Sequence, residues 1–175
     1  VRIQYGIMNT VFALIASTCA VFITSRLLNG KFHIYQIQIA SISGGVAIGA
    51  SSSFLTNPAI AMIIGLFAGI ITTVPLNFLM PILKEKAFFH DSRGGFIVHG
   101  FSGVIGSVIS SIATVLYTHD GIRDSSQWGF QLIGLAVTLA VAIASGLMIG
   151  TFCKFFFPLN KHQKRFHDDD NILTA

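Results

Sequence analysis

The chain has 175 residues, 53% of them hydrophobic and only 10% charged, and its formal net charge is +4. A soluble domain carries about a quarter charged residues, so this composition excludes an ordinary water-soluble protein and indicates a protein of the lipid bilayer. The positive charge does not indicate a nucleic-acid partner, because the basic residues lie between and after apolar stretches and form no basic groove.

Five stretches are long and apolar enough to cross a bilayer, which takes about 20 residues of helix. In chain order they cover about residues 7–28, 34–56, 59–83, 92–118 and 129–157. They are apolar around their whole circumference, which is typical of membrane helices and not of the surface helices of soluble proteins. The sequence therefore predicts an all-α fold, a polytopic transmembrane helix bundle of about five spans over residues 1–157, followed by a polar C-terminal tail over residues 158–175.

Small residues recur within these stretches at helical spacing. Glycines four residues apart lie on one helix face and predict that a neighbouring helix approaches that face closely. The pairs are Gly45 and Gly49, Gly65 and Gly69, and Gly146 and Gly150. This spacing is common in membrane helices, so it indicates a tightly packed bundle and no particular function.

The basic residues orient the bundle. With five spans, nine of the 11 Lys and Arg residues fall on one side of the membrane, and only Arg2 and Arg123 fall on the other. The nine are Arg26, Lys31, Lys84, Lys86, Arg93, Lys154, Lys161, Lys164 and Arg165. The positive-inside rule places that side, and with it the C-terminus, in the cytoplasm or an equivalent compartment. We expect the plasma membrane, with an organellar membrane as the alternative.

Clusters of catalytic or metal-binding residues are not visible inside the five stretches. No pair of acids, nucleophile–base arrangement or metal-spaced ligand set lies within one of them, so the sequence argues against a membrane enzyme and predicts no cofactor and no metal. Cys19 and Cys153 each stand alone in or at the end of an apolar run, and we expect both to be buried thiols.

His99 is the one titratable residue expected inside a span. If Asp91 caps the helix of the fourth stretch, His99 lies eight residues further on, about 12 Å along the axis. In a hydrocarbon layer of about 30 Å this position approaches the midplane. An imidazole there is expected to be uncharged and to need a hydrogen-bond partner inside the protein or in a wet lumen.

Three glycines follow this histidine: Gly100, Gly103 and Gly106. Gly103 and Gly106 share the helix face of His99 and leave room beside the ring for a side chain, a backbone or a narrow passage. Two interpretations stay open from the residues alone. His99 lines a functional path, or it is a core histidine that bonds to a carbonyl or serine of an adjacent helix.

The order of these motifs resembles a known family. Asp91, Gly94 and the run HGFSGVIG that begins at His99 look like the second pore-histidine helix of the Rh branch of ammonium transporters. Residues 38–49, QIASISGGVAIG, are similar to an upstream segment of that branch, and residues 65–83 resemble the span between the two. On these motifs the chain is identified as a member of the Amt/MEP/Rh ammonium transporter family, corresponding to its C-terminal half only.

The resemblance implies a trimeric channel built from an inverted repeat, with a narrow apolar pore in each subunit. Two histidines from opposite halves face each other in that pore, and His99 matches the second. Ammonium is expected to lose a proton near the entrance, and ammonia to cross past the histidine pair; some Rh members are also credited with carbon dioxide passage. The implied partners are ammonia or ammonium, the lipid bilayer, and the missing N-terminal half or a partner chain that supplies the other histidine. A homotrimer or a larger membrane complex is expected.

Two departures from the family pattern support an alternative. Ile39 and Ile97 stand at positions where the family has asparagine. Loss of polar groups at both positions favours a non-conducting, Rh-like structural subunit of a larger membrane assembly. Retention of His99 with its glycines favours a conducting channel.

Overall fold

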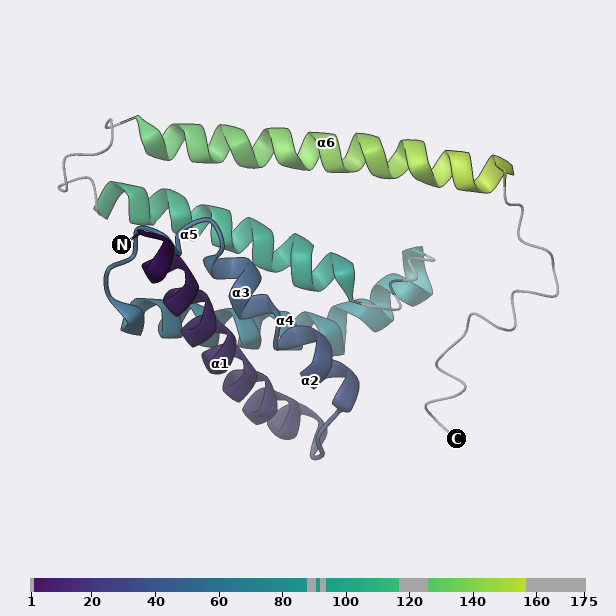
Figure 1. Cartoon of the computed structure of the whole chain (residues 1–175). Helices are drawn as coiled ribbons and strands as arrows, with labels where there is room; N and C mark the ends of the chain where they lie inside the picture. Colours follow the sequence, from purple (N-terminus) through teal and green to yellow (C-terminus); the bar gives the residue numbers. More distant parts are fainter. Residues whose placement is uncertain (1, 88–90, 92–93, 117–125, 157–175) are drawn as a thin grey trace. The chain divides into compact units, whose positions relative to one another are not determined.

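The computed structural model of the chain describes residues 2–87, 91, 94–116 and 126–156, and each regular element in that part of the chain is helical. In chain order the elements are α1 (Arg2–Asn29), α2 (Ile34–Ala40), α3 (Ser43–Ile48), α4 (Pro58–Ala87), the π-helix η1 (Phe96–Phe101), α5 (Ser102–Leu116) and α6 (Gln127–Phe156) (Figure 1). The all-α prediction is confirmed. The predicted tail over residues 158–175 lies outside the described residues.

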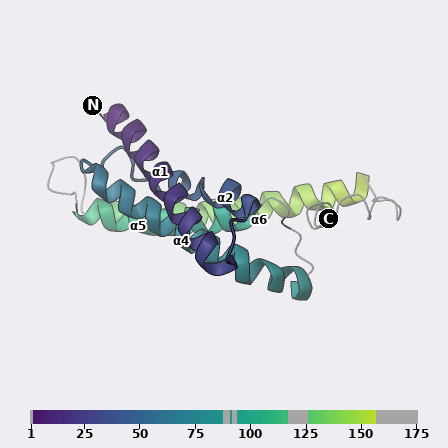
Figure 2. The ribbon, with the colours of Figure 1, turned by 90° about the horizontal axis from the view of Figure 1, so that it is seen from below.

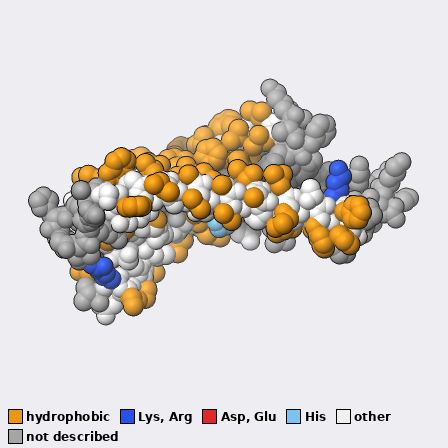
Figure 3. All heavy atoms as spheres, turned by 90° about the horizontal axis from the view of Figure 1, so that it is seen from above, with side chains coloured by type: hydrophobic (Ala, Val, Ile, Leu, Met, Phe, Trp, Pro, Cys, Tyr) orange, Lys and Arg blue, Asp and Glu red, His pale blue; other side chains and the backbone are white. Residues whose placement is uncertain are grey.

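Four helices in the described part are long and apolar enough to cross a membrane. They are Arg2–Asn29, Pro58–Leu83, Phe96–Leu116 and Gln127–Phe156. Hydrophobic side chains cover much of the face seen in Figure 3. Large ones such as Ile3, Ile7 and Phe67 are more than half exposed. Such a surface indicates that lipid surrounds the helices, as the composition predicts.

The predicted stretch 34–56 does not form one continuous helix. It forms α2 and α3, separated by a turn at Ser41 and Ile42, and residues 49–54 continue as turns. Hydroxyl groups compensate the break: Ser17 of α1 donates to the Ser41 carbonyl, and Ser43 donates to the Ala40 carbonyl at 2.6 Å. Because a helix end leaves carbonyls without helical partners, these side chains stabilise the interruption inside an apolar bundle.

Close backbone approaches hold α1, α3 and α4 together. A Cβ atom at Gly65 of α4 would clash with the Ala13 backbone of α1, and one at Gly69 would lie 2.6 Å from the Ser17 carbonyl. Gly44 of α3 meets the same two residues of α1. Figure 2 shows α1 crossing α4 along this contact. The close approach predicted for the pair in α4 is therefore confirmed.

A buried polar network joins α1, α2 and α4. The Gln36 side chain of α2 is 6% exposed, and its Oε1 accepts bonds from Ser25 at 3.0 Å and Asn29 at 2.9 Å. Its Nε2 donates to Asn77 of α4 at 3.2 Å. Each polar group in such a network offsets the cost of removing another from water, so the network fixes how the three helices pack.

The chain divides into two compact units, Val1–Leu132 and Ile133–Ala175. The first holds α1 to α5 and the first turns of α6, and the second holds the rest of α6. Cys19 and Cys153 are both exposed, so the prediction of buried thiols is wrong. A cysteine in an apolar membrane helix faces outward as readily as inward, because lipid accepts it as well as a core does.

Candidate functional site around His99

The helix that carries His99 begins at a sharply defined turn. Gly94 has φ +64°, a left-handed conformation that favours glycine. The space that its side chain would fill is occupied by Ile39 of α2, whose Cγ2 lies 2.8 Å from an ideal Cβ position. The Asp91 carboxylate accepts the backbone N–H of Gly95 at 3.0 Å and of Phe96 at 2.7 Å. A carboxylate at this helix end satisfies free N–H groups and opposes the positive end of the helix dipole.

The first turn after this start is a π-helix, η1. The rings of Phe96 and Phe101 lie five residues apart, which is one turn of a π-helix. Their centroids are 6.2 Å apart with an interplanar angle of 78°, an edge-to-face contact. A π turn accommodates one more residue than an α turn and so rotates the side chains that precede it relative to those that follow.

His99 lies on the exposed side of this turn. Its neighbours Ile97 and Val98 are 0% and 3% exposed, whereas the His99 side chain is exposed. Within the described residues no hydrogen bond to its ring is present, so the interpretation as a core histidine bonded to an adjacent helix finds no support there. The imidazole remains available to a group outside the described part of the chain.

His99 lies closer to the start of its helix than a count from Asp91 predicts. The helix begins only at Gly95, four residues after Asp91, so His99 lies about 6 Å along it instead of about 12 Å. The Asp91 side chain reaches the helix start across a turn and does not occupy the position next to it. Counting residues from Asp91 therefore overestimates how far His99 lies along the helix.

The three glycines after His99 have different surroundings. Gly106 packs against the Ala47 backbone of α3, where a Cβ would clash. A Cβ at Gly100 would lie 3.6 Å from the Phe96 ring, an ordinary contact, and a Cβ at Gly103 would meet nothing within 4 Å among the described residues outside its own helix backbone. Among these three glycines, close packing within the described residues occurs only at Gly106. The space at Gly103 is open on the described chain.

A hydroxyl pair behind this turn was not singled out from the sequence. Thr72 of α4 and Ser102 of α5 are 0% and 1% exposed, and their oxygens lie 2.9 Å apart. Hydroxyl residues inside apolar stretches are the available sequence signal, but many such residues bond only to their own helix. Thr73, for example, donates to the Gly69 carbonyl at 2.7 Å.

Ile39 and Ile97, where the resemblance leads to an expectation of asparagine, lie on the packed side. Ile97 belongs to a buried cluster with Val21, Ala40 and Leu76, and Ile39 packs against that cluster. The two replacements therefore occur together, in one apolar region behind η1. Replacing a polar pair by apolar side chains in one place leaves no unpaired polar group.

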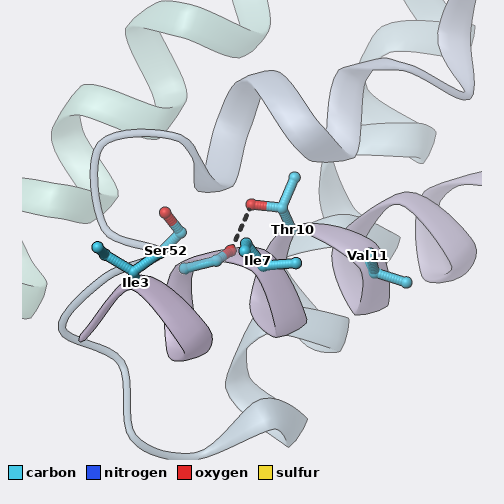
Figure 4. Close-up of a pocket in the computed structure, with 6 residues that line it drawn as sticks. Ile3, Ile7, Thr10, Val11 and Ser52 are labelled. Carbon is cyan, nitrogen blue, oxygen red and sulfur yellow. Dashed lines mark hydrogen bonds between the residues drawn. The ribbon is translucent and has the colours of Figure 1, made fainter. Parts of the chain in front are cut away.

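Apart from the His99 region, the described residues form a groove on α1 but no metal-binding cluster. An open groove is lined by Ile3, Ile7, Thr10 and Val11 of α1, with Gly6 and Ser52 (Figure 4). Within it the Thr10 hydroxyl donates to the Gly6 carbonyl at 2.7 Å, so its polar content is small. Among the described residues no group of three or more His, Cys, Asp and Glu could hold a metal ion.

Comparison with known proteins places these features in context. A model of the Ammonium Transporter Family matches residues 2–173. The chain is 33% identical over 165 residues to ammonium transporter Rh type B of Takifugu rubripes, covering 84% of this chain and 36% of that protein. It is 35% identical over 166 residues to ammonium transporter Rh type B of Xenopus tropicalis, covering 85% of this chain and 36% of that protein.

Solved structures share the arrangement of helices. The chain resembles Nitrosomonas europaea Rh50, described with the mechanism of conduction by the Rhesus protein family of channels, at a TM-score of 0.74 and 28% identity, over 99% of this chain and 47% of that one. It also matches a sensor Amt protein at a TM-score of 0.75 and 23% identity, over 94% of this chain and 40% of that one, which shows the fold alone.

The chain spans about a third of the length of the curated relatives it matches, 36% in both proteins named above. Those relatives are named as transporters and the solved Rh50 structure as a channel, in agreement with the prediction that the chain is not an enzyme.

Proposed function

The chain belongs to the ammonium transporter family, and on that premise we propose that it forms the part of an ammonia-conducting channel that carries a pore histidine, His99. The observations that carry this proposal are the exposure of His99 on η1 and the open space at Gly103, four residues further along the chain. A narrow path for neutral ammonia needs apolar walls and one or two hydrogen-bonding groups. The region around η1 offers this combination.

The proposal requires a second surface. The exposed side of η1 has no lid within the described residues, so the facing wall comes from the N-terminal half of a longer protein or from a partner chain. In the proposed assembly that wall supplies a second histidine, and the subunits form a homotrimer or part of a larger membrane complex. We place the protein in the plasma membrane, with its C-terminus on the cytoplasmic side. Carbon dioxide, another small neutral gas, is a second proposed substrate.

One observation favours the alternative of a non-conducting structural subunit. Ile39 and Ile97 remove polar groups that the resemblance leads one to expect. However, both side chains belong to or pack against the cluster behind η1, and Ile97 is 0% exposed. Their apolar character therefore changes how η1 packs and does not by itself block a path on the side of His99.

The proposal is tested by flux through the intact protein in proteoliposomes. After an ammonium chloride jump, a trapped pH dye reports the rate at which ammonia enters. We expect His99→Ala to lower that rate by about tenfold, because losing one hydrogen-bond partner costs about 1.4 kcal/mol. His33→Ala is the matched control, since His33 lies at the turn between α1 and α2 and bonds through its backbone: its N–H donates to Ser25 at 3.2 Å and its carbonyl accepts from Ile37 at 3.0 Å.

Equal rates for the wild type and His99→Ala, at equal protein incorporation, would remove His99 from the mechanism. An intact protein that conducts no better than protein-free liposomes would support the structural subunit instead. A parallel jump in carbon dioxide tests the second substrate.

A further inference from the structure

The hydroxyl pair between α4 and α5 has a defined direction. The Thr72 hydroxyl donates to the Ala68 carbonyl of its own helix at 2.7 Å. A hydroxyl has one hydrogen, so once Thr72 has donated it, the bond of 2.9 Å between Thr72 and Ser102 must use the Ser102 hydrogen. Ser102 is therefore the donor, and Thr72 the acceptor.

Ser102 is also joined to His99. It is the first residue of α5, directly after η1, and its backbone N–H donates to the His99 carbonyl. A continuous path thus runs from α4 through the two hydroxyls and the Ser102 backbone to the peptide group of His99. The path ends at the point where the π turn returns to an α-helix, which is where the rotation of the turn is set.

We propose that Thr72 and Ser102 are positioning residues that hold the π turn in the register presenting His99 to the conducting path. This inference rests on the proposed function and extends it, because it names the groups that set the direction of the ring. The second support for η1, the Asp91 carboxylate, holds only the beginning of the turn. Without the hydroxyl pair, the end of the turn is free to relax toward an α-helix and rotate His99.

A merely structural role gives a different expectation. A hydrogen bond between membrane helices contributes little to stability on average, because polar groups find other partners when the helices separate. If Thr72 only helped α4 and α5 to pack, its loss would weaken the fold slightly and leave His99 in place. The two roles are therefore separated by a signal from the His99 ring.

The chain provides a matched control beside the proposed residue. Thr73 is, like Thr72, 0% exposed and bonds to the carbonyl four residues earlier, at 2.7 Å. Among the described residues the Thr73 hydroxyl makes no bond to another helix. Thr72→Val and Thr73→Val thus remove the same group from equivalent burial, and only the first removes the contact with Ser102.

The experiment uses the intact protein labelled with ¹⁵N-histidine in lipid bilayers. The ring signal of His99 is assigned by its loss in His99→Ala, and ammonia flux is measured in the same samples. We expect Thr72→Val and Ser102→Ala each to shift the His99 signal and lower the flux by about three- to fivefold. The double variant is expected to match the worse single variant, because the two substitutions remove the same contact between Thr72 and Ser102. Thr72→Ser, which keeps the hydroxyl, and Thr73→Val are expected to resemble the wild type.

The proposal is overturned if Thr72→Val leaves the His99 signal unchanged, or if Thr73→Val shifts it equally. Thr72→Val and Thr72→Ser decide the question even where Ser102→Ala fails to fold. If the hydroxyl variants shift the His99 signal while His99→Ala retains full flux, the positioning role stands and the proposed function of His99 fails. The two failures are therefore distinguishable.

Discussion

At the scale of single residues, the start of the helix that carries His99 is closely packed against neighbouring helices. Gly94 lies in a left-handed conformation against Ile39, and Ile97 is fully buried two residues before His99. Both positions are apolar and tightly filled. Substitutions that add a side chain or a polar group there act on the helix start without touching the exposed ring.

We expect Ile97→Asn to destabilise the protein by about 1–3 kcal/mol, because it places an unpaired amide in the apolar cluster. Ile97→Val is the control and removes one methylene, at a cost of about 0.5–1.5 kcal/mol. Denaturation in detergent, followed by the loss of helical circular dichroism, measures both. Equal stability of Ile97→Asn and the wild type would mean that a polar partner lies near this position after all.

Gly94→Ala tests the turn before η1. A left-handed conformation costs an L residue about 1–2 kcal/mol, and the new methyl group would also meet Ile39 at 2.8 Å. Gly30→Ala is the matched control, because Gly30 has φ +68° but a Cβ added there would meet nothing within 4 Å among the described residues. We expect Gly94→Ala to be the more destabilising of the two in the same denaturation assay. An equal loss would show that backbone strain alone matters.

At the scale of elements, the approach of α5 to α3 depends on one small residue. Gly106 lies against the Ala47 backbone, whereas a Cβ added at Gly103, one turn earlier on the same helix, would meet nothing within 4 Å among the described residues outside its own helix backbone. The sequence pattern does not distinguish the two glycines, but their surroundings in the structure differ. The contact between the two helices lies at Gly106.

Gly106→Ala is expected to separate α3 and α5 and to destabilise the protein by about 1–3 kcal/mol, because a packed backbone contact cannot absorb a methyl group. Gly103→Ala is expected to change stability by less than about 0.5 kcal/mol, and to gain helix propensity. Thermal unfolding of the two variants in matched lipid provides the comparison. A larger effect at Gly103 would reveal a neighbouring surface from outside the described residues.

At the scale of the whole molecule, the exposed apolar surface and the charge distribution define how the protein lies in a membrane. None of the residues of α6 is buried, and the other three long helices also expose large apolar side chains. Lipid or further protein must cover these surfaces, because water does not. The basic residues then decide which way the helices cross.

We expect a tag at the C-terminus to be protected from protease added outside intact cells and cleaved after permeabilisation. The reason is the excess of Lys and Arg on the side to which the C-terminus was assigned. Cleavage of the tag in intact cells would contradict this prediction and place the C-terminus on the outer side.

The sequence by itself determined the fold class and the family, because hydropathy and motif order are local properties of the chain. The five apolar stretches, the order of Gln38, His99 and their glycines, and the scarcity of charge inside the stretches are all read without knowing any contact. They predicted membrane helices and the family of ammonium transporters, and they selected His99 from the six histidines.

Only the tertiary structure decided how His99 is held. The break between α2 and α3, the π turn and the bond between Thr72 and Ser102 join groups from different helices, and the last joins residues 30 positions apart. Hydropathy carries no information on such pairs, because a hydroxyl that bonds to its own helix and one that bonds across to another have the same local sequence pattern. The packing of the helices chooses between them, and thereby forms the contact between α4 and the first residue of α5.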